Sequence, residues 1–529
     1  MSRKVVLCIL DGFGESPSPN PIPEGDAIKI AKTPNIDALR KAHPYSFLDA
    51  CGESVGLLPG GMGGSEIGHV ALGAGRVIPQ FALMIKRSIE NGSFFKNAAL
   101  QSAVKHVKED EHRSLHLLGM ISDAGVHSDI SHLYALLRLA RQEKLTRVFI
   151  HCIADGRDVK KNVTSYLSAL QEKIDEIGVG QVASVIGRFY AMDRDNNWDR
   201  TKVAYDLMVT GKGVKIEAKA KRSGKRSLVP ELIENIEEYY KSSDDGDYYL
   251  PPMICVENGT IRNGDALIFF NYRTDRPRQL TSVFDKSDDF GEFEIQHDKT
   301  QVHFVAMGPY TSHAPVAFDM PRATNNLGDW LSQHNVKQLR VAETEKFAHV
   351  TFFFNSQNDE PSATEDRILV PSKKVESFAE KPEMSAAEIT NEVVNAMNEQ
   401  VYSVIIVNYA NADLVGHSGK LQPTIKAIET LDSCIGRLTE QAEKSNHVLM
   451  ITGDHGNAED MIYADGTEKK SHSMNPVIFL LCDYSKSDNS TTTTARLRNG
   501  GLADVAPTLL QVIGLEKPKE MTGQSLLIP

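Results

Sequence analysis

Three short apolar runs in the sequence are each followed by residues of the types that bind divalent metals. The candidates are Asp11 after residues 5–10, Asp413 and His417 after residues 404–407, and Asp454 and His455 after residues 448–452. Ligands of open parallel sheets bind beyond the carboxyl ends of the strands, so these side chains are expected at one edge of a sheet. His472 follows later in the chain. Carboxylates mixed with imidazoles suit Mn²⁺ or Zn²⁺ better than Ca²⁺.

Each of these patterns has an ordinary structural explanation when it is taken alone. An Asp after a strand is often a helix cap, and the i, i+4 pair Asp413 and His417 is often a surface pair. Asp454-His455-Gly456-Asn457 is also typical of a turn. The repetition of the pattern after three similar strands is what favours a metal site.

A single hydroxyl, Ser65, ends a glycine-rich stretch and begins an apolar one, residues 67–72. Glycines allow backbone conformations and close approaches that other residues prevent. The pattern predicts a loop that places Ser65 at a helix N-terminus, where free N–H groups favour an anion such as phosphate. A serine in such a loop is usually only part of a turn, so the hypothesis of a nucleophile depends on the metal-binding residues elsewhere.

A second set of candidate residues is rich in arginine, and its members follow predicted strands in the middle of the chain. The set comprises His127, Arg157, Asp158, Arg188, Arg194, Arg273 and Arg276. Guanidinium groups pair bidentately with phosphate and carboxylate, so the set predicts a pocket for a small dianion. Lys346 is a further candidate for this pocket, although alone it would be read as a solvated side chain.

The elements that must position these residues alternate between strands and helices. Buried strands are predicted at residues 5–10, 404–407, 448–452 and 477–481, and the middle of the chain has strands at residues 115–120, 148–153, 182–186, 266–271 and 302–307. Helical patterns at residues 131–143 and 162–177 separate some of these strands. The alternation predicts an α/β fold with a parallel sheet. The change of pattern near residue 80 and its return near residue 318 predict one discontinuous domain, 1–79 and 318–529, interrupted by a second, 80–317.

Composition limits the possible partners and the cellular location. The 529 residues carry a formal net charge of −12, which argues against a general nucleic-acid binder. The six cysteines are scattered and form no CxxC motif, and no apolar run approaches the length of a membrane span. We therefore expect a cytoplasmic protein that binds neither nucleic acid nor membrane.

The motifs together resemble the cofactor-independent phosphoglycerate mutases of the alkaline-phosphatase superfamily, over nearly the whole chain. The resemblance rests on residues 10–14, 62–69, 155–158, 193–195, 343–346, 412–417 and 454–457. Two positions depart from the usual family pattern, since Gly64 stands where Asn is common and Gly453 where Ala is common. The resemblance implies a phosphatase-like metal-binding domain interrupted by a transferase domain that binds the substrate.

The resemblance also implies roles for the candidate residues. Two divalent ions, usually Mn²⁺, with Mg²⁺, Co²⁺ or Zn²⁺ as alternatives, are expected in two sets of ligands. These sets are Asp413, His417 and His472 for one ion, and Asp11, Ser65, Asp454 and His455 for the other. The arginine-rich set and Lys346 are expected to hold the substrate, with Ser65, Asp158 and Lys346 acting in catalysis.

The implied reaction interconverts 3-phosphoglycerate and 2-phosphoglycerate, in glycolysis and gluconeogenesis, through a phosphoserine at Ser65 and without 2,3-bisphosphoglycerate. The transferase domain is expected to exclude water that would hydrolyse the phosphoserine. A monomer acting on a small molecule is expected. The alternatives are a metal-dependent phosphatase or another phosphomutase of the same superfamily, and a metal-dependent binding protein without catalysis.

Overall fold

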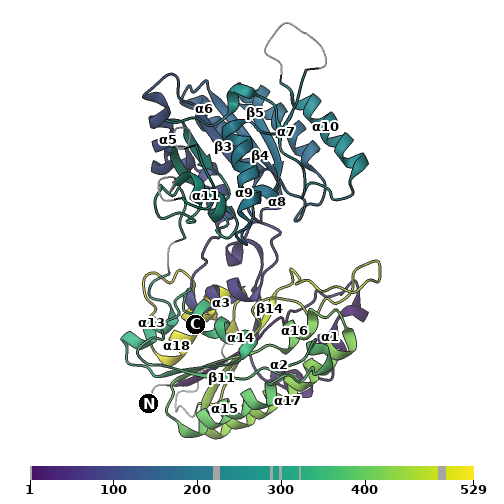
Figure 1. The fold of residues 1–529 in the computed structure, drawn as a ribbon. Coiled ribbons are helices and arrows are strands. Elements are labelled where there is room, and N and C mark those ends of the chain that lie inside the picture. The colour runs from purple at the N-terminus through teal and green to yellow at the C-terminus, as the bar shows by residue number, and fades with distance from the viewer. Residues whose placement is uncertain are drawn as a thin grey trace. The chain divides into compact units, whose positions relative to one another are not determined.

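The computed structural model describes residues 3–218, 227–285, 290–296, 301–320, 323–485 and 496–528. The chain divides into two compact units, which we call unit 1 (Met1–Gln80 and Pro321–Pro529) and unit 2 (Phe81–Met320). Each unit is an α/β structure with its own central sheet and its own core (Figure 1).

Among the described residues, unit 1 contains an eight-stranded sheet in the order β11-β10-β12-β1-β13-β14-β2-β16. In that order the strands are Glu365–Val370, Gln338–Glu343, Val404–Tyr409, Lys4–Leu10, His447–Thr452, Val477–Asp483, Tyr45–Asp49 and Gly500–Gly501. The first five strands are parallel to one another. Their apolar sequences follow from this position, since a parallel strand between layers of helices is buried on both faces.

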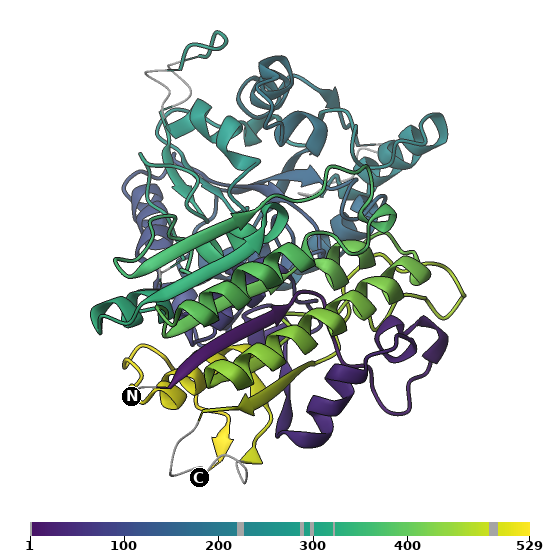
Figure 2. The ribbon, with the colours of Figure 1, turned by 90° about the horizontal axis from the view of Figure 1, so that it is seen from below.

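Helices cover both faces of the unit 1 sheet. Alternate residues of β1 point to opposite faces, so Val6 and Cys8 pack with α15 (Ala386–Glu399) and α17 (Leu421–Ser445). Val5 and Leu7 pack on the other side, in a core with α3 (Ser65–Ala74), α13 (Leu327–Gln333) and α18 (Val505–Ile513). Figure 2 shows α15 and α17, in green, running side by side past β1, in purple. Shorter helices of this unit are α1 (Ala27–Ile30), α2 (Pro34–Ala42), α14 (Thr344–Ala348) and α16 (Asn411–Gly416).

One part of the unit 1 sheet differs from the parallel arrangement expected from the sequence. β14 is antiparallel to both of its neighbours, β13 and β2. A parallel return requires a long crossover, usually a helix. The connection from β13 to β14, residues 453–476, forms no helix and instead carries candidate ligands, so β14 returns in the opposite direction.

The described part of unit 2 contains a seven-stranded sheet in the order β6-β7-β5-β4-β3-β8-β9. In that order the strands are Val214–Lys215, Met253–Ile254, Gln181–Gly187, Val148–Ala154, Leu115–Met120, Ala266–Phe269 and His303–Ala306. The run from β5 to β9 is parallel. α5 (Ala98–Lys108), α6 (Ile130–Gln142), α7 (Val163–Ile177) and α10 (Val229–Ser242) pack in the core of one face. α9 (Trp198–Tyr205) and α11 (Pro277–Asp285) pack in the core of the other, and α4 (Phe81–Glu90) and α8 (Arg188–Ala191) complete the unit.

The strands predicted from apolar runs are confirmed, with small differences at their ends. β3 covers the predicted residues 115–120, whereas β8 ends at Phe269, before the predicted residue 271. The predicted helix start at Ser65 is also confirmed, since α3 begins there. The apolar patterns in the sequence therefore identified the strands and the helix whose ends carry the candidate residues.

Candidate active site

Four neighbouring strands of unit 1 deliver charged side chains to one edge of the sheet. β10, β12, β1 and β13 are adjacent and parallel, so their carboxyl ends meet at the same edge. The residues that follow them there are Lys346 on α14, Asp413 on α16, Asp11 and Asp454. With Ser65, His417, His455 and His472 they form what we call the serine cluster.

Glycines bring the serine-bearing helix close to this edge. The chain enters α3 through Gly64, whose backbone is extended, and Ser65 is the first helical residue. A Cβ at Gly68 would lie 2.7 Å from the carbonyl oxygen of Asp454, and one at Gly63 would lie 2.0 Å from that of Ala50. Only glycine allows these approaches, which hold Ser65 against the ends of the strands.

The Ser65 hydroxyl is at the centre of a buried polar network. Its Oγ donates to Asp11 Oδ1 at 2.9 Å and lies 3.0 Å from His455 Nε2. The ammonium group of Lys346 donates to Ser65 Oγ at 2.6 Å, to Asp11 Oδ1 at 2.8 Å and to Asp413 Oδ2 at 2.7 Å. Ser65 therefore touches a carboxylate, an imidazole and a cation simultaneously.

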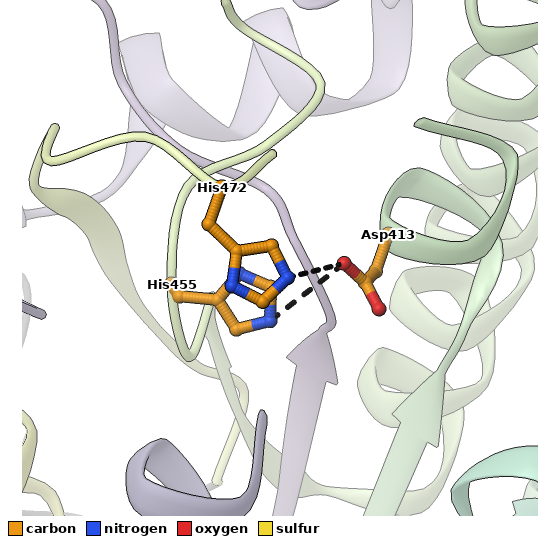
Figure 3. Close-up of side chains that lie close together, drawn as sticks. All are labelled: Asp413, His455 and His472. Atoms are coloured by element: carbon orange, nitrogen blue, oxygen red, sulfur yellow. Dashed lines mark ion pairs between the residues drawn. The ribbon is translucent and has the colours of Figure 1, made fainter. Parts of the chain in front are cut away.

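Two groups of side chains in this cluster have the arrangement of metal ligands. One comprises Asp413, His455 and His472, and the other Asp11, Asp454 and His455. Figure 3 shows the two imidazoles of the first group with their Nε2 atoms directed at Asp413, at 3.8 Å for His455 and 3.3 Å for His472. His417 reaches the same place, with Nε2 3.2 Å from Asp413 Oδ1 and 3.1 Å from His472 Nε2.

The hydrogen bonds behind these side chains fit divalent ions. Each of the three imidazoles donates Nδ1–H to a backbone carbonyl, an arrangement that fixes the tautomer and leaves Nε2 for a ligand. These bonds join His417 to Lys470, His472 to Gly63 and His455 to Gly456, at 2.7, 2.7 and 3.2 Å. Asp454 Oδ1 accepts from Gly12 N at 3.1 Å, while its buried Oδ2 lies 3.2 Å from His69 Nδ1. The donor set of carboxylates and imidazoles suits first-row divalent ions.

Electrostatics favours positive charge throughout the serine cluster. Burial alone would raise the pKa of Asp11, but Lys346 and His455 hold this pKa well below its usual range. Burial alone would lower the pKa of Lys346, but Asp11 and Asp413 raise it. Burial would lower the pKa of His455, yet Asp454 and Asp11 raise it to about 10. The carboxylates therefore favour either a proton or a metal ion at the Nε2 position of His455.

Three residues that the sequence analysis assigned no role also belong to this network. Asn408, near the end of β12, donates to Asp11 Oδ2 at 2.8 Å, and Asn457 donates to Asp413 Oδ1 at 2.9 Å. His69 lies one helical turn after Ser65 on α3, and its Nδ1 is 2.8 Å from the carbonyl oxygen of Ser65. The i, i+4 spacing of Ser65 and His69 was the signal in the sequence that could have identified His69.

The two departures from the usual family pattern differ in how tightly they are packed. A Cβ at Gly453 would be 2.5 Å from the carbonyl oxygen of Phe13, in the loop after Asp11. A Cβ at Gly64 would meet the His472 ring at 3.4 Å. In this chain glycine at position 453 lets the loops after β1 and β13 approach one another, whereas a Cβ at position 64 would make an ordinary contact.

In unit 2, the arginine-rich set also lies beyond the carboxyl ends of parallel strands. The strands β5, β4, β3 and β8 are adjacent and parallel, and the set follows them. We call this set the arginine cluster: His127, Arg157, Asp158, Arg188, Arg194, Arg273 and Arg276. Lys346, which the sequence analysis added to this set, instead contacts Ser65 in unit 1.

Arg188 is the buried centre of the arginine cluster. Its Nη1 donates to Asp155 Oδ1 at 2.6 Å and to Asp158 Oδ2 at 2.8 Å. Its Nη2 lies 3.0 Å from His127 Nε2, which accepts because a guanidinium group can only donate. Burial and the charge of Arg188 lower the pKa of His127 to about 4, which keeps this imidazole neutral.

The other arginines surround a common region. Arg194 and Arg273 both contact the carboxylate of Asp275, at 2.8 and 3.2 Å. Arg276 donates to the carbonyl oxygen of Met192 at 2.9 Å. Burial, followed by the charges of Arg188 and Arg194, lowers the pKa of Arg276, and Arg157 contributes as well. Guanidinium groups that repel one another in this way form a site suited to an anion.

No helix in the described ranges is both long enough and apolar enough to cross a lipid bilayer.

Comparisons with known proteins agree with the chemistry of the serine cluster. A model of the Metalloenzyme superfamily matches residues 3–517. The chain is 42% identical to the 2,3-bisphosphoglycerate-independent phosphoglycerate mutase of Clostridium acetobutylicum, over 99% of this chain and 100% of that protein. It is 45% identical to the protein of the same name from Desulforudis audaxviator, over 99% of each. The crystal structure of Leishmania mexicana phosphoglycerate mutase at low cobalt concentration matches 100% of this chain and 98% of that one, with 28% identity and a TM-score of 0.62.

These matches span both units, and the family model shows that the protein is a metalloenzyme. The chain therefore belongs to the Metalloenzyme superfamily and, within it, to the family of 2,3-bisphosphoglycerate-independent phosphoglycerate mutases.

Proposed function

We propose that this protein interconverts 3-phosphoglycerate and 2-phosphoglycerate through a phosphoserine formed at Ser65, as a step of glycolysis and gluconeogenesis. The observation that carries the proposal is the position of Ser65 Oγ, which contacts Asp11, His455 and Lys346 within one buried cluster. A serine hydroxyl is a weak nucleophile unless its surroundings stabilise the oxygen that has lost its proton. This cluster offers Asp11 as a hydrogen-bond acceptor that orients the hydroxyl and Lys346 as a cation that stabilises the oxygen.

In the first half of the reaction, Ser65 Oγ attacks phosphorus and the bond from phosphorus to the C3 oxygen breaks. The hydrogen bond to Asp11 Oδ1 orients the Ser65 hydroxyl, and with the divalent ions bound its proton would be lost to solvent. The neighbouring carboxylates raise the pKa of Lys346 although burial alone would lower it. Its ammonium group therefore stays charged and stabilises the transferred phosphoryl group. The C3 oxygen takes up a proton as glycerate forms.

In the second half, the 2-hydroxyl of the retained glycerate loses its proton and attacks phosphorus. The bond from phosphorus to Ser65 Oγ breaks, and Oγ takes up a proton from solvent, which restores the Ser65 hydroxyl. We assign the proton transfers at the glycerate hydroxyls to Asp158, whose carboxylate Arg188 holds at 2.8 Å. The arginine cluster binds the carboxylate and phosphate of the substrate through bidentate hydrogen bonds. Because the phosphate never leaves the enzyme, the reaction requires no 2,3-bisphosphoglycerate.

We assign two divalent ions to the serine cluster, one to Asp413, His417 and His472 and the other to Asp11, Ser65, Asp454 and His455. His455 belongs to both groups of side chains that could hold an ion, with Nε2 3.8 Å from Asp413 Oδ1. When bound, such ions act as Lewis acids that neutralise phosphoryl charge and orient the attacking and leaving oxygens. Mn²⁺ is the proposed ion because the ligands combine carboxylates with imidazoles, and Mg²⁺, Co²⁺ and Zn²⁺ are the alternatives to be compared.

We also propose that residues 1–79 and 318–529 form a phosphatase-like metal-binding domain and residues 80–317 a transferase domain. The serine cluster lies in unit 1 and the arginine cluster in unit 2, which supports this division of roles. The six free cysteines agree with a reducing, cytoplasmic location. We propose a monomer that acts on a small molecule, without nucleic-acid or membrane partners.

The test is to incubate the Mn²⁺-loaded protein with 3-phosphoglycerate and to measure 2-phosphoglycerate and free phosphate together. A mutase forms 2-phosphoglycerate with little free phosphate. Release of free phosphate as the main product would identify a phosphatase, and binding without any turnover would identify a non-catalytic binding protein. Either of those results would contradict the proposed function.

A further inference from the structure

A closed ring of hydrogen bonds lies behind the Ser65 hydroxyl. Ser65 Oγ donates to Asp11 Oδ1 at 2.9 Å, and the second oxygen of that carboxylate, Oδ2, accepts from Asn408 Nδ2 at 2.8 Å. The same amide nitrogen is 3.0 Å from His69 Nε2. The ring closes at His69 Nδ1, which is 2.8 Å from the carbonyl oxygen of Ser65.

The partners in this ring determine the hydrogen positions. A carbonyl oxygen only accepts, so His69 carries its hydrogen on Nδ1 and accepts at Nε2. The amide of Asn408 has two hydrogens, one for Asp11 Oδ2 and one for His69 Nε2. The reverse orientation of this amide would place its oxygen against the Asp11 carboxylate. Both hydrogens of the Asn408 amide are therefore used in the ring.

All of the ring's members are buried. His69 and Asn408 are 0% exposed, and Asp11 is 0% exposed as well. Hydrogen bonds in such surroundings are strong, and a buried group that loses its partner is costly. The edge of the His349 ring also packs against His69, with centroids 5.4 Å apart. Breaking any hydrogen bond of the ring therefore leaves a buried polar group without its partner.

We infer that His69 and Asn408 are positioning residues, which fix the Ser65 hydroxyl against Asp11 and select the carboxylate oxygen that faces it. Neither residue donates directly to Ser65 Oγ, so both act through Asp11 and the start of α3. By holding Oδ2, Asn408 directs Oδ1 toward Ser65 and Lys346. The inference rests on the proposed function of Ser65 as nucleophile and of Asp11 as a ligand.

The variant Asn408→Leu tests this role, because leucine is similar in shape and cannot donate. We expect kcat to fall about 10- to 100-fold, the range typical when partners of metal ligands are removed, while KM changes less than about twofold. The full-length variant should also bind Mn²⁺ about 10- to 100-fold more weakly, as measured by calorimetry without substrate.

The chain offers a matched control in Asn355. This buried amide of unit 1 donates to the Glu365 carboxylate at 2.8 Å, the same distance as in the pair of Asn408 and Asp11. Asn355→Leu removes an equivalent buried hydrogen bond away from Ser65. It should lower stability without reducing kcat or Mn²⁺ affinity.

Variants of His69 separate positioning from a general loss of structure. Glutamine can still accept from Asn408, whereas leucine cannot, so His69→Gln should retain more of the parent kcat than His69→Leu. In the double variant His69→Leu and Asn408→Leu, the loss in kcat should be close to the larger single loss, because one ring is broken in both cases.

Parent-like kcat and Mn²⁺ affinity in Asn408→Leu would overturn the inference. Losses equal to those of Asn355→Leu, or additive losses in the double variant, would do the same. Mn²⁺ binding is measured without substrate, so a parent protein that formed no 2-phosphoglycerate would refute the proposed function while the binding comparison still tested the ring.

Discussion

The serine cluster of unit 1 and the arginine cluster of unit 2 occupy equivalent places in two sheets but hold their charges differently. Both lie beyond the carboxyl ends of adjacent parallel strands. In the serine cluster, Lys346 is 4% exposed and contacts two carboxylates and the nucleophile. In the arginine cluster, Arg194 and Arg273 are 46% and 52% exposed and share the carboxylate of Asp275.

This difference shows which side chains are already held in position before a substrate binds. The buried network around Ser65 has little freedom, as electrostatic stabilisation of a reacting atom requires. The exposed arginines can exchange Asp275 for a carboxylate or phosphate of the substrate at small cost, because exposed ion pairs are weak. Arg188 is the exception, since it is 1% exposed and held by two carboxylates.

Removal of divalent ions should have the largest effect and should act on the serine cluster alone. We expect chelation to abolish mutase activity and added Mn²⁺ to restore it, because the converging carboxylates and imidazoles need a cation. Activity is measured after metal removal, with metal content determined on the same sample. Full activity in a metal-free sample would show that the cluster works without a divalent ion.

Ser65→Ala should reduce mutase activity at least about a thousandfold, since the nucleophile is lost. Mn²⁺ binding at Asp413, His417 and His472 should persist, because Ser65 is not a ligand of that group. Ser46→Ala, a change at another buried serine of unit 1, serves as the control. Near-normal turnover by Ser65→Ala would contradict the phosphoserine mechanism.

A comparison of Arg188 with Arg273 tests the contrast between a buried and an exposed arginine of the arginine cluster. Arg188→Leu leaves the buried Asp155 carboxylate without its cation, so we expect a loss of about 3 kcal/mol in the free energy of unfolding. Arg273→Lys should change stability by less than about 0.5 kcal/mol, because the side chain is exposed. It should still lower kcat/KM about tenfold or more, since lysine lacks the bidentate fork.

Urea unfolding measures stability in these two variants, and steady-state kinetics measures kcat/KM in Arg273→Lys. Equal stabilities of the two variants would show that Arg188 is no more tightly held than Arg273. Parent-like kcat/KM in Arg273→Lys would exclude Arg273 as a substrate ligand.

The last prediction concerns pH and a buried histidine of unit 2 that belongs to neither cluster. Burial lowers the pKa of His132 to about 4 in the folded chain, against about 6.5 when exposed. Between these values the unfolded chain binds more protons, so stability is lost as pH falls from about 6.5 toward 4. The contribution of His132 is about 3 kcal/mol at most, from 1.36 kcal/mol per pKa unit.

The measurement is the apparent free energy of unfolding between pH 7 and pH 5 for His132→Leu and the parent. The variant should lose less stability on acidification than the parent does. His112→Leu, at an exposed position, is the control. An unchanged pH dependence in His132→Leu would mean that His132 is hydrated in the folded protein.

Much of the fold and of the candidate site could be predicted from the sequence, because both depend on local patterns. Apolar runs report burial on both faces of a strand, and they identified β1, β12 and β13 together with the ligand types that follow them. Glycines before Ser65 indicated the start of α3. The family resemblance then assigned roles to individual residues, which the order of elements along the chain could not do.

Other features were decided only by the tertiary structure. The antiparallel direction of β14, the place of Lys346 beside Ser65 and the ring through His69 and Asn408 all join residues far apart in sequence. Local periodicity carries no information about which strands become neighbours, and a one-dimensional pattern cannot tell which of two carboxylate oxygens faces a hydroxyl. The order of strands in the sheet determines these contacts, since it sets which strand ends meet at one edge.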